Sequence, residues 1–170
     1  MREQDRLAAI ASDLAGRPVA VHCPSFLAAL VHTRTEGGYV EFDAHGRPAD
    51  HTDLSPETCG ALRRLDRVDF RCIDRGSCTF KQFKAAWAAH TLAHEAFHLR
   101  GIPTEAIAEC YALQNTAFVA ERLGVATAQA KALQQWVYVK GYPNEPDEYR
   151  TDKCGDAGAY DLRPDSPDFP

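Results

Sequence analysis

Residues 90–110, with the sequence HTLAHEAFHLRGIPTEAIAEC, contain three histidines spaced four residues apart. On a helix, side chains at positions i and i+4 lie on one face a turn apart, so two such imidazoles can bind the same metal ion. The outer two, His90 and His98, would be about 12 Å apart at 1.5 Å per residue. Zinc–nitrogen bonds are only about 2 Å long, so one ion can bind His94 together with either neighbour, but not all three.

The glutamate that follows His94 decides between the two pairs. The carboxylate of Glu95 can hydrogen-bond a water molecule on an ion held by His94 and His98, whereas the residue after His90 is a threonine, which offers no base. We therefore predict that His94 and His98 bind a metal and that His90 packs beside them. The helix predicted over 80–100 is apolar around much of its girth, which indicates burial, and buried histidines and carboxylates need partners.

The sequence HEAFH at residues 94–98 resembles the zinc site of the zincin metallopeptidases, in which two histidines bind zinc and the intervening glutamate is the general base. Gly101, three residues further on, is similar to a glycine of the metzincin branch. Thr104, however, stands where metzincins have a third histidine, and no methionine other than Met1 is present to form their Met-turn. The resemblance therefore points to a compact member of the gluzincin type, in which the third ligand is a carboxylate.

Two glutamates of the next predicted helix are candidates for that third ligand. Glu105 lies seven residues after His98, directly after the chain reversal that Gly101 and Pro103 indicate. Glu109 lies one helical turn later on the same face, and it reaches the site only if the two helices cross closely. We predict Glu105 as the ligand and Glu109 as the alternative, with the other carboxylate accepting a hydrogen bond beside the site.

The resemblance implies a Zn²⁺-dependent peptidase acting on a peptide or protein substrate. In such an enzyme Glu95 takes a proton from zinc-bound water as it attacks the amide carbonyl, and then delivers it to the leaving amine. The sequence leaves open which side chain stabilises the oxyanion, among His90, Arg100, Tyr111, Tyr138 and Tyr142. The alternative from another class is a non-catalytic interaction domain, either metal-free or with a structural zinc ion.

Composition and charge limit the other function classes. With 170 residues, 45% hydrophobic and 25% charged, the chain is typical of a soluble globular protein. The net charge of −5 arises from residues 141–170, which hold eight acidic and three basic residues, while residues 1–140 are balanced. We therefore expect no basic surface for nucleic acid. The sequence contains no uninterrupted apolar run of about eighteen residues, so we expect no membrane span.

Six cysteines are many for a cytosolic chain of this length. The even number suits disulfides, and none of the cysteines forms a CxxC pair that would indicate a cysteine zinc site. The cysteines favour a location outside the cytoplasm, although the N-terminal residues contain no apolar signal core. Of the fifteen possible arrangements, a disulfide between Cys59 and Cys110 is one candidate, since it would tie the helix of Cys59 to the helix of the predicted ligands.

Local sequence patterns predict the helices and strands that position these residues. We expect two or three antiparallel strands between residues 19 and 43, and turn chemistry in the DAHGRP that follows. Apolar periodicity and capping residues predict helices near the N-terminus, at 56–66, 80–100, 104–123 and 127–141. The expected class is α+β, predominantly helical: a minimal zincin-like domain over 1–140. Residues 141–170 form an acidic tail rich in Pro and Gly, packed on this domain or extending from it.

Overall fold

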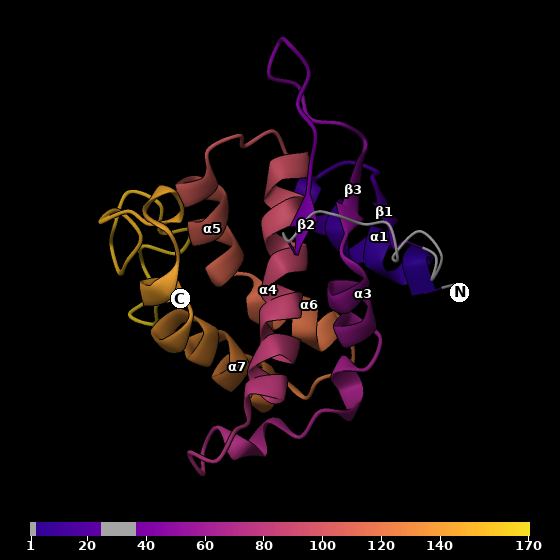
Figure 1. Cartoon of the computed structure of the whole chain (residues 1–170). Helices are drawn as coiled ribbons and strands as arrows, with labels where there is room; N and C mark the ends of the chain where they lie inside the picture. Colours follow the sequence, from indigo (N-terminus) through magenta and orange to yellow (C-terminus); the bar gives the residue numbers. More distant parts are fainter. Residues whose placement is uncertain (1–2, 25–36) are drawn as a thin grey trace.

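A computed structural model of the chain describes residues 3–24 and 37–170 (Figure 1). Helices predominate and are accompanied by one small sheet, so the expected α+β class is confirmed. The helices are α1 Glu3–Ala15, α3 Pro56–Leu62, α4 Phe80–Leu99, α5 Glu105–Leu113, α6 Thr116–Arg122 and α7 Thr127–Lys140. Four short 3₁₀ turns are η1 Leu65–Arg67, η2 Phe70–Cys72, η3 Tyr142–Asn144 and η4 Asp147–Tyr149.

Helix α4 is the centre of the molecule, and α1, α3, α5, α6 and α7 all pack against it (Figure 1). A capping box between Thr79 and Gln82 begins the helix. From residue 88 onward the side chains of α4 are buried, including those of its three histidines and Glu95. The helix ends in a Schellman motif, with Gly101 at φ +102° and the Ile102 amide donating to the Phe97 carbonyl at 3.2 Å. The histidines of α4 therefore lie inside the core, and the chain reverses its direction directly after them.

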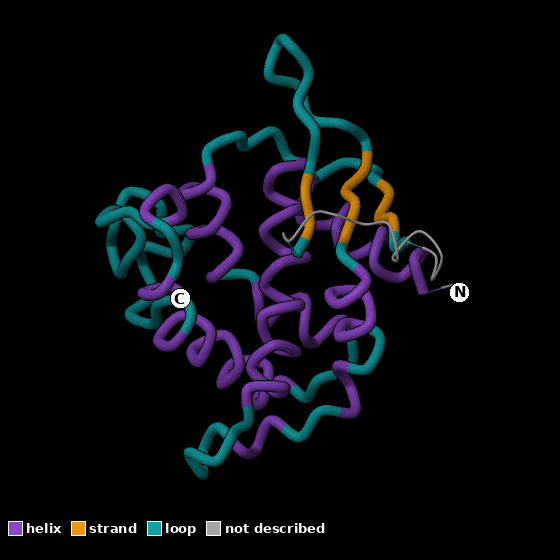
Figure 2. Tube along the Cα trace, viewed as in Figure 1, coloured by secondary structure: helices purple, strands orange, loops and turns teal. Residues whose placement is uncertain are grey.

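The sheet contains three strands, β1 Ala20–His22, β2 Gly38–Tyr39 and β3 His51–Leu54, in the order β1-β3-β2 (Figure 2). Strand β2 pairs with β3 in antiparallel fashion, but β1 and β3 are parallel, so the prediction of an all-antiparallel region was wrong. Strand β3 was not predicted because three of the four residues in HTDL are polar, and only Thr52 and Leu54 point inward. The predicted strand region includes residues 25–36, which lie outside the described residues.

The helix predicted over 104–123 is broken into α5 and α6. The break falls at three consecutive polar residues whose side chains hydrogen-bond backbone carbonyls four positions earlier. Gln114 donates to the carbonyl of residue 110 at 3.0 Å, and Asn115 and Thr116 each donate at 2.8 Å to those of residues 111 and 112. Such bonds compete with the regular helical ladder, so the chain turns here. Helix α3 is also shorter than predicted and ends at Leu62.

Three disulfides connect all six cysteines: Cys23–Cys59, Cys72–Cys78 and Cys110–Cys154. The suggested Cys59–Cys110 pair was wrong, because Cys59 lies beside the end of β1 and Cys110 faces the C-terminal segment. Three disulfides fit an oxidising environment outside the cytoplasm. Among the described residues, each helix is too short or too polar to cross a lipid bilayer.

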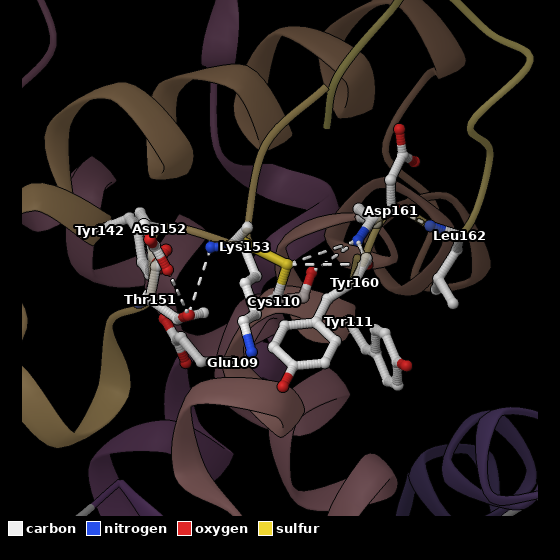
Figure 3. The surroundings of a disulfide bond; sticks show 12 residues. Glu109, Cys110, Tyr111, Tyr142, Thr151, Asp152, Lys153, Tyr160, Asp161 and Leu162 are labelled. Carbon is white, nitrogen blue, oxygen red and sulfur yellow. Dashed lines mark hydrogen bonds between the residues drawn. A yellow bond between two sulfur atoms is a disulfide. The ribbon is translucent and has the colours of Figure 1, made fainter. Parts of the chain in front are cut away.

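The C-terminal segment is irregular, as expected, and it packs on the body of the protein. The Cys110–Cys154 disulfide fastens it to α5 immediately after Glu109 (Figure 3). Gln114 donates to the Tyr160 carbonyl at 2.8 Å, and farther along the chain the Pro170 carbonyl accepts a hydrogen bond from α7. This packing brings η4 against α5.

Candidate metal centre

The structure brings together the three residues predicted to bind a metal. The Nε2 atoms of His94 and His98 lie 2.9 Å apart, and Glu105 Oε2 lies 3.0 Å from the first and 3.1 Å from the second. Two ligands at about 2.0–2.1 Å from a tetrahedral zinc ion would be about 3.3 Å apart. The observed triangle is therefore only slightly smaller than the one that an ion requires, and these His and Glu side chains could hold a metal ion.

Local structure explains how Glu105 reaches the histidines. The reversal at Gly101 turns the chain, Pro103 prevents its direct continuation as helix, and α5 then begins at Glu105. Since α5 packs along α4, the first residue of α5 faces the last turn of α4, where His98 lies. The side chain of Glu105 is 38% exposed, while those of the two histidines are buried, so the triangle opens toward solvent on the side of the carboxylate.

The second ring nitrogen of His94 and that of His98 each have a hydrogen-bond partner outside the triangle. His94 Nδ1 lies 2.9 Å from Glu109 Oε2, and His98 Nδ1 donates to the Ile102 carbonyl at 2.7 Å. When Nδ1 carries the proton, the lone pair of Nε2 is directed at the centre of the triangle. Carboxylate and carbonyl partners of this kind orient metal-binding histidines and increase their basicity. Glu109, the alternative third ligand, therefore supports His94 from the opposite side to Glu105.

His90 belongs to the same network but not to the triangle. Its Nε2 lies 2.8 Å from Glu109 Oε1, and its Nδ1 lies 3.2 Å from the Thr116 hydroxyl. His90, His94 and Glu109 also form a cluster compact enough to hold an ion. In that cluster each histidine addresses a different carboxylate oxygen, so Glu109 bridges two rings. In the first triangle both rings converge on one oxygen of Glu105, so that its three ligand atoms lie within 3.1 Å of one another.

The electrostatics of the metal-free site keep a proton among these groups. Burial alone would lower the pKa of His94, but hydrogen bonds to Glu105 and Glu109 and the charge of Glu109 raise it to about 10. Burial would likewise raise the pKa of both glutamates, yet the facing histidines lower each to about 2. At neutral pH the carboxylates are therefore ionised and His94 is protonated. A cation that enters the triangle replaces that proton.

Glu95 is buried and lies beside β2. A Cβ atom added to Gly38 would come within 2.9 Å of Glu95 Cγ and 3.1 Å of Glu95 Oε1, so a glycine is needed where strand and glutamate meet. Both residues line a cavity of about 240 Å³. Its wall also contains Gly37, Trp87, His90, Thr91, His94, Glu109, Glu145, Pro146 and Tyr149.

A second cavity of about 490 Å³ continues the first toward the start of α4. The two share Gly37, Trp87, Thr91 and Glu145, and the second adds aromatic and basic groups that include Phe80, Phe83, Lys84 and Lys140. Positions 83, 87, 91 and 95 repeat every four residues, so one face of α4 forms the floor of both cavities. The arrangement is a groove that leads from Glu95 along the helix.

One glutamate and one tyrosine of the C-terminal segment line the smaller cavity, and the sequence predicted neither of them. The ring of Tyr149 lies 5.7 Å from that of His94, and burial together with the charge of Glu109 raises the pKa of Glu145. Their positions depend on how a segment without regular structure folds back, and neither has a spacing signal relative to HEAFH. The PNEP and PDEY turns at 143–149 were the only local sign that this stretch is ordered.

The tyrosines that the sequence suggested for stabilising the oxyanion make other contacts in the structure. The Tyr142 hydroxyl accepts a hydrogen bond from the Thr151 amide at 2.9 Å, and Tyr138 stacks on Tyr142. Tyr111 packs against Phe97 in the core. Arg100 is exposed at the end of α4.

Comparisons of the chain with protein-family models, with curated proteins and with solved structures found no match, so the function must be argued from the geometry.

Proposed function

We propose that this chain is a zinc-dependent metallopeptidase. The observation that carries the proposal is the convergence of His94, His98 and Glu105 on one point, with Glu95 one residue from the first ligand and at the wall of a groove. Two imidazoles and one carboxylate suit zinc, and three protein ligands leave a fourth position for water, as in catalytic rather than structural zinc sites. Glu95, which is buried and lines the same cavity as His94, would serve as the general base.

A zinc ion held by His94, His98 and Glu105 would supply Lewis acidity for the amide carbonyl and for a bound water. Glu95 accepts the proton that this water loses and passes it to the nitrogen of the leaving amine. Glu109 and the Ile102 carbonyl keep the two imidazoles in the orientation that binding needs. Tyr149 lies over the ring of His94 in the same cavity, and we assign to its phenol the stabilisation of the oxyanion.

The groove indicates how a substrate would bind. Within the described part of the chain β2 is the edge strand of the sheet next to α4, and its Gly37–Gly38 entry contributes backbone rather than side chains to the cavity wall. An extended peptide can pair with such an edge, which places its backbone beside Glu95. The larger cavity, with Phe83 and Trp87, would take a bulky apolar side chain of that peptide. We therefore propose extended peptide segments as substrates.

The test combines metal analysis with cleavage of a peptide library that varies apolar residues. Glu95→Gln should retain zinc, because Glu95 is not a ligand, while cleavage falls by about 10²–10⁴-fold. Glu121→Gln is the matched control, since Glu121 is an exposed glutamate of α6, and should behave as the wild type. Cleavage by Glu95→Gln at the wild-type rate, or absence of zinc from active protein, would refute the proposal.

A second candidate is a metal-free interaction domain, and one observation favours it. Each ring nitrogen of His94 and His98 already has a protein partner within 3.1 Å, so the network is satisfied without an ion. On this reading, zinc would be absent from protein purified without chelator, and added zinc would change neither the melting temperature nor any cleavage. The three disulfides support a place of action outside the cytoplasm for either candidate, and we propose that the protein is secreted.

A further inference from the structure

A second cluster of metal-binding side chains lies on the outer face of the sheet. On β3, Thr52 and Leu54 point into the core, so His51 and Asp53 share the opposite face. His22 of β1 is the direct cross-strand partner of Asp53. Because cross-strand partners point to the same side of a sheet, two imidazoles and one carboxylate from two parallel strands meet on one surface.

The distances in this cluster are those of ligands around an ion rather than of direct hydrogen bonds. His22 Nδ1 lies 3.4 Å from Asp53 Oδ1, and His51 Nε2 lies 3.5 Å from Asp53 Oδ2. Protein N–H···O hydrogen bonds are about 2.7–3.2 Å long, whereas two ligands of a tetrahedral zinc ion are about 3.3 Å apart. One ligand atom of each residue lies within 4.8 Å of the other two.

A neighbouring carboxylate orients one of the rings. His51 Nδ1 lies 3.0 Å from Asp50 Oδ1, so the ring donates its Nδ1 proton there and turns the Nε2 lone pair toward Asp53. A lone pair facing a carboxylate is repulsive unless a proton or a cation lies between them. The rings of His22 and His51 stack with centroids 4.6 Å apart, on the same side of the sheet as Asp53. One divalent cation satisfies both rings and the carboxylate together.

We propose that His22, His51 and Asp53 form a second metal site, separate from the triangle on α4, that binds a divalent transition-metal ion. Two imidazoles with one carboxylate select zinc, nickel or copper over calcium and magnesium. The side chains are between 33% and 54% exposed, so the ion exchanges with solvent and keeps water in its remaining positions. Such an ion joins β1 to β3 across their parallel pairing and thereby stabilises the sheet that carries β2.

The proposal does not depend on peptidase activity, and a zinc titration of the full chain by calorimetry tests it. Wild-type protein stripped of metal should bind two equivalents of zinc. Asp53→Asn and His51→Gln should each bind one, whereas His98→Gln should retain the outer site. His45→Gln is the matched control, since His45 is an exposed histidine in the connection between β2 and β3, and it should bind two. Near-ultraviolet circular dichroism verifies that each variant is folded.

A variant of Asp50 distinguishes a residue that orients a ligand from a residue that binds the ion. Asp50→Asn keeps all three ligands but removes the charge behind His51, so the affinity of the outer site should fall by about 10–100-fold while the number of bound ions is unchanged. Magnesium at the same concentration should not compete. The same number of bound ions in the wild type and in folded Asp53→Asn and His51→Gln would overturn the proposal.

Discussion

Zinc binding by His94 and its partners should release a proton and therefore depend steeply on pH. The pKa of His94 in the metal-free site is raised to about 10, although burial opposes the shift, because Glu105 and Glu109 hold the protonated ring. Three pH units below that value, about one ring in a thousand is neutral and able to bind. Each unit corresponds to about 1.36 kcal/mol, so displacing the proton at pH 7 costs about 4 kcal/mol of binding free energy.

The apparent affinity for zinc should accordingly rise about tenfold per pH unit between pH 7 and 9, and level off near pH 10. Calorimetric titrations at one pH in buffers of different ionisation enthalpy count the protons released, and we expect about one per ion at pH 7 to 8. His51→Gln serves as the background protein, so that the outer site does not contribute. A pH-independent affinity, or binding without proton release, would refute the assignment of the proton to His94.

Stability of the metal-free protein offers a second readout with a defined sign. A raised histidine pKa contributes stability that is complete below the unfolded value of 6.5 and is lost as the pH rises toward 10. The lowered pKa values of Glu105 and Glu109 contribute stability that is present above 4.5 and is lost as the pH falls toward 2. The melting temperature without metal should therefore be highest between about pH 4.5 and 6.5. With saturating zinc the decline at alkaline pH should vanish, as thermal denaturation measurements would show.

Three further changes should have distinct effects. Glu105→Gln should weaken zinc binding at the α4 site more than Glu109→Gln, which removes only the support behind one imidazole and should cost about 10–100-fold in affinity by calorimetry. Gly38→Ala should destabilise the fold by about 1–3 kcal/mol in chemical denaturation and impair cleavage more than zinc binding, because the new methyl group would lie 2.9 Å from Glu95 Cγ. Replacing Cys110 and Cys154 together by alanine opens a loop of 44 residues and should cost about 4 kcal/mol in chemical denaturation, with unchanged stability arguing against the disulfide.

The sequence predicted the central triangle because the relevant geometry is local. Four residues correspond to one helical turn, so His94 and His98 had to share a face wherever the helix lay. Gly101 and Pro103 are short-range signals for a reversal, and these placed Glu105 near the end of the same helix. The interpretation of Glu109 as a supporting carboxylate followed from the same spacing, and the structure places it beside His94.

Features that depend on distant parts of the chain could not be predicted in this way. The parallel pairing of β1 with β3 joins residues 20–22 to residues 51–53, and nothing in either segment indicates its partner. The three disulfides are one arrangement among fifteen. Tyr149 reaches the cavity only because the segment tied down by Cys154 folds back against α5. The triangle could therefore be predicted from the sequence, while the groove beside His94 could not.

The burial of the α4 network is itself an argument for function. His90, His94 and Glu109 are almost fully buried, and their hydrogen-bond partners are one another, Thr116, Glu105 and His98. Buried ionic clusters rarely stabilise a protein more than apolar residues of the same size, because desolvation offsets most of their attraction. A core helix selected for stability alone would carry leucine at these positions. The protein instead places charge in its centre beside a groove, an arrangement that the proposed metal binding would explain and that packing does not.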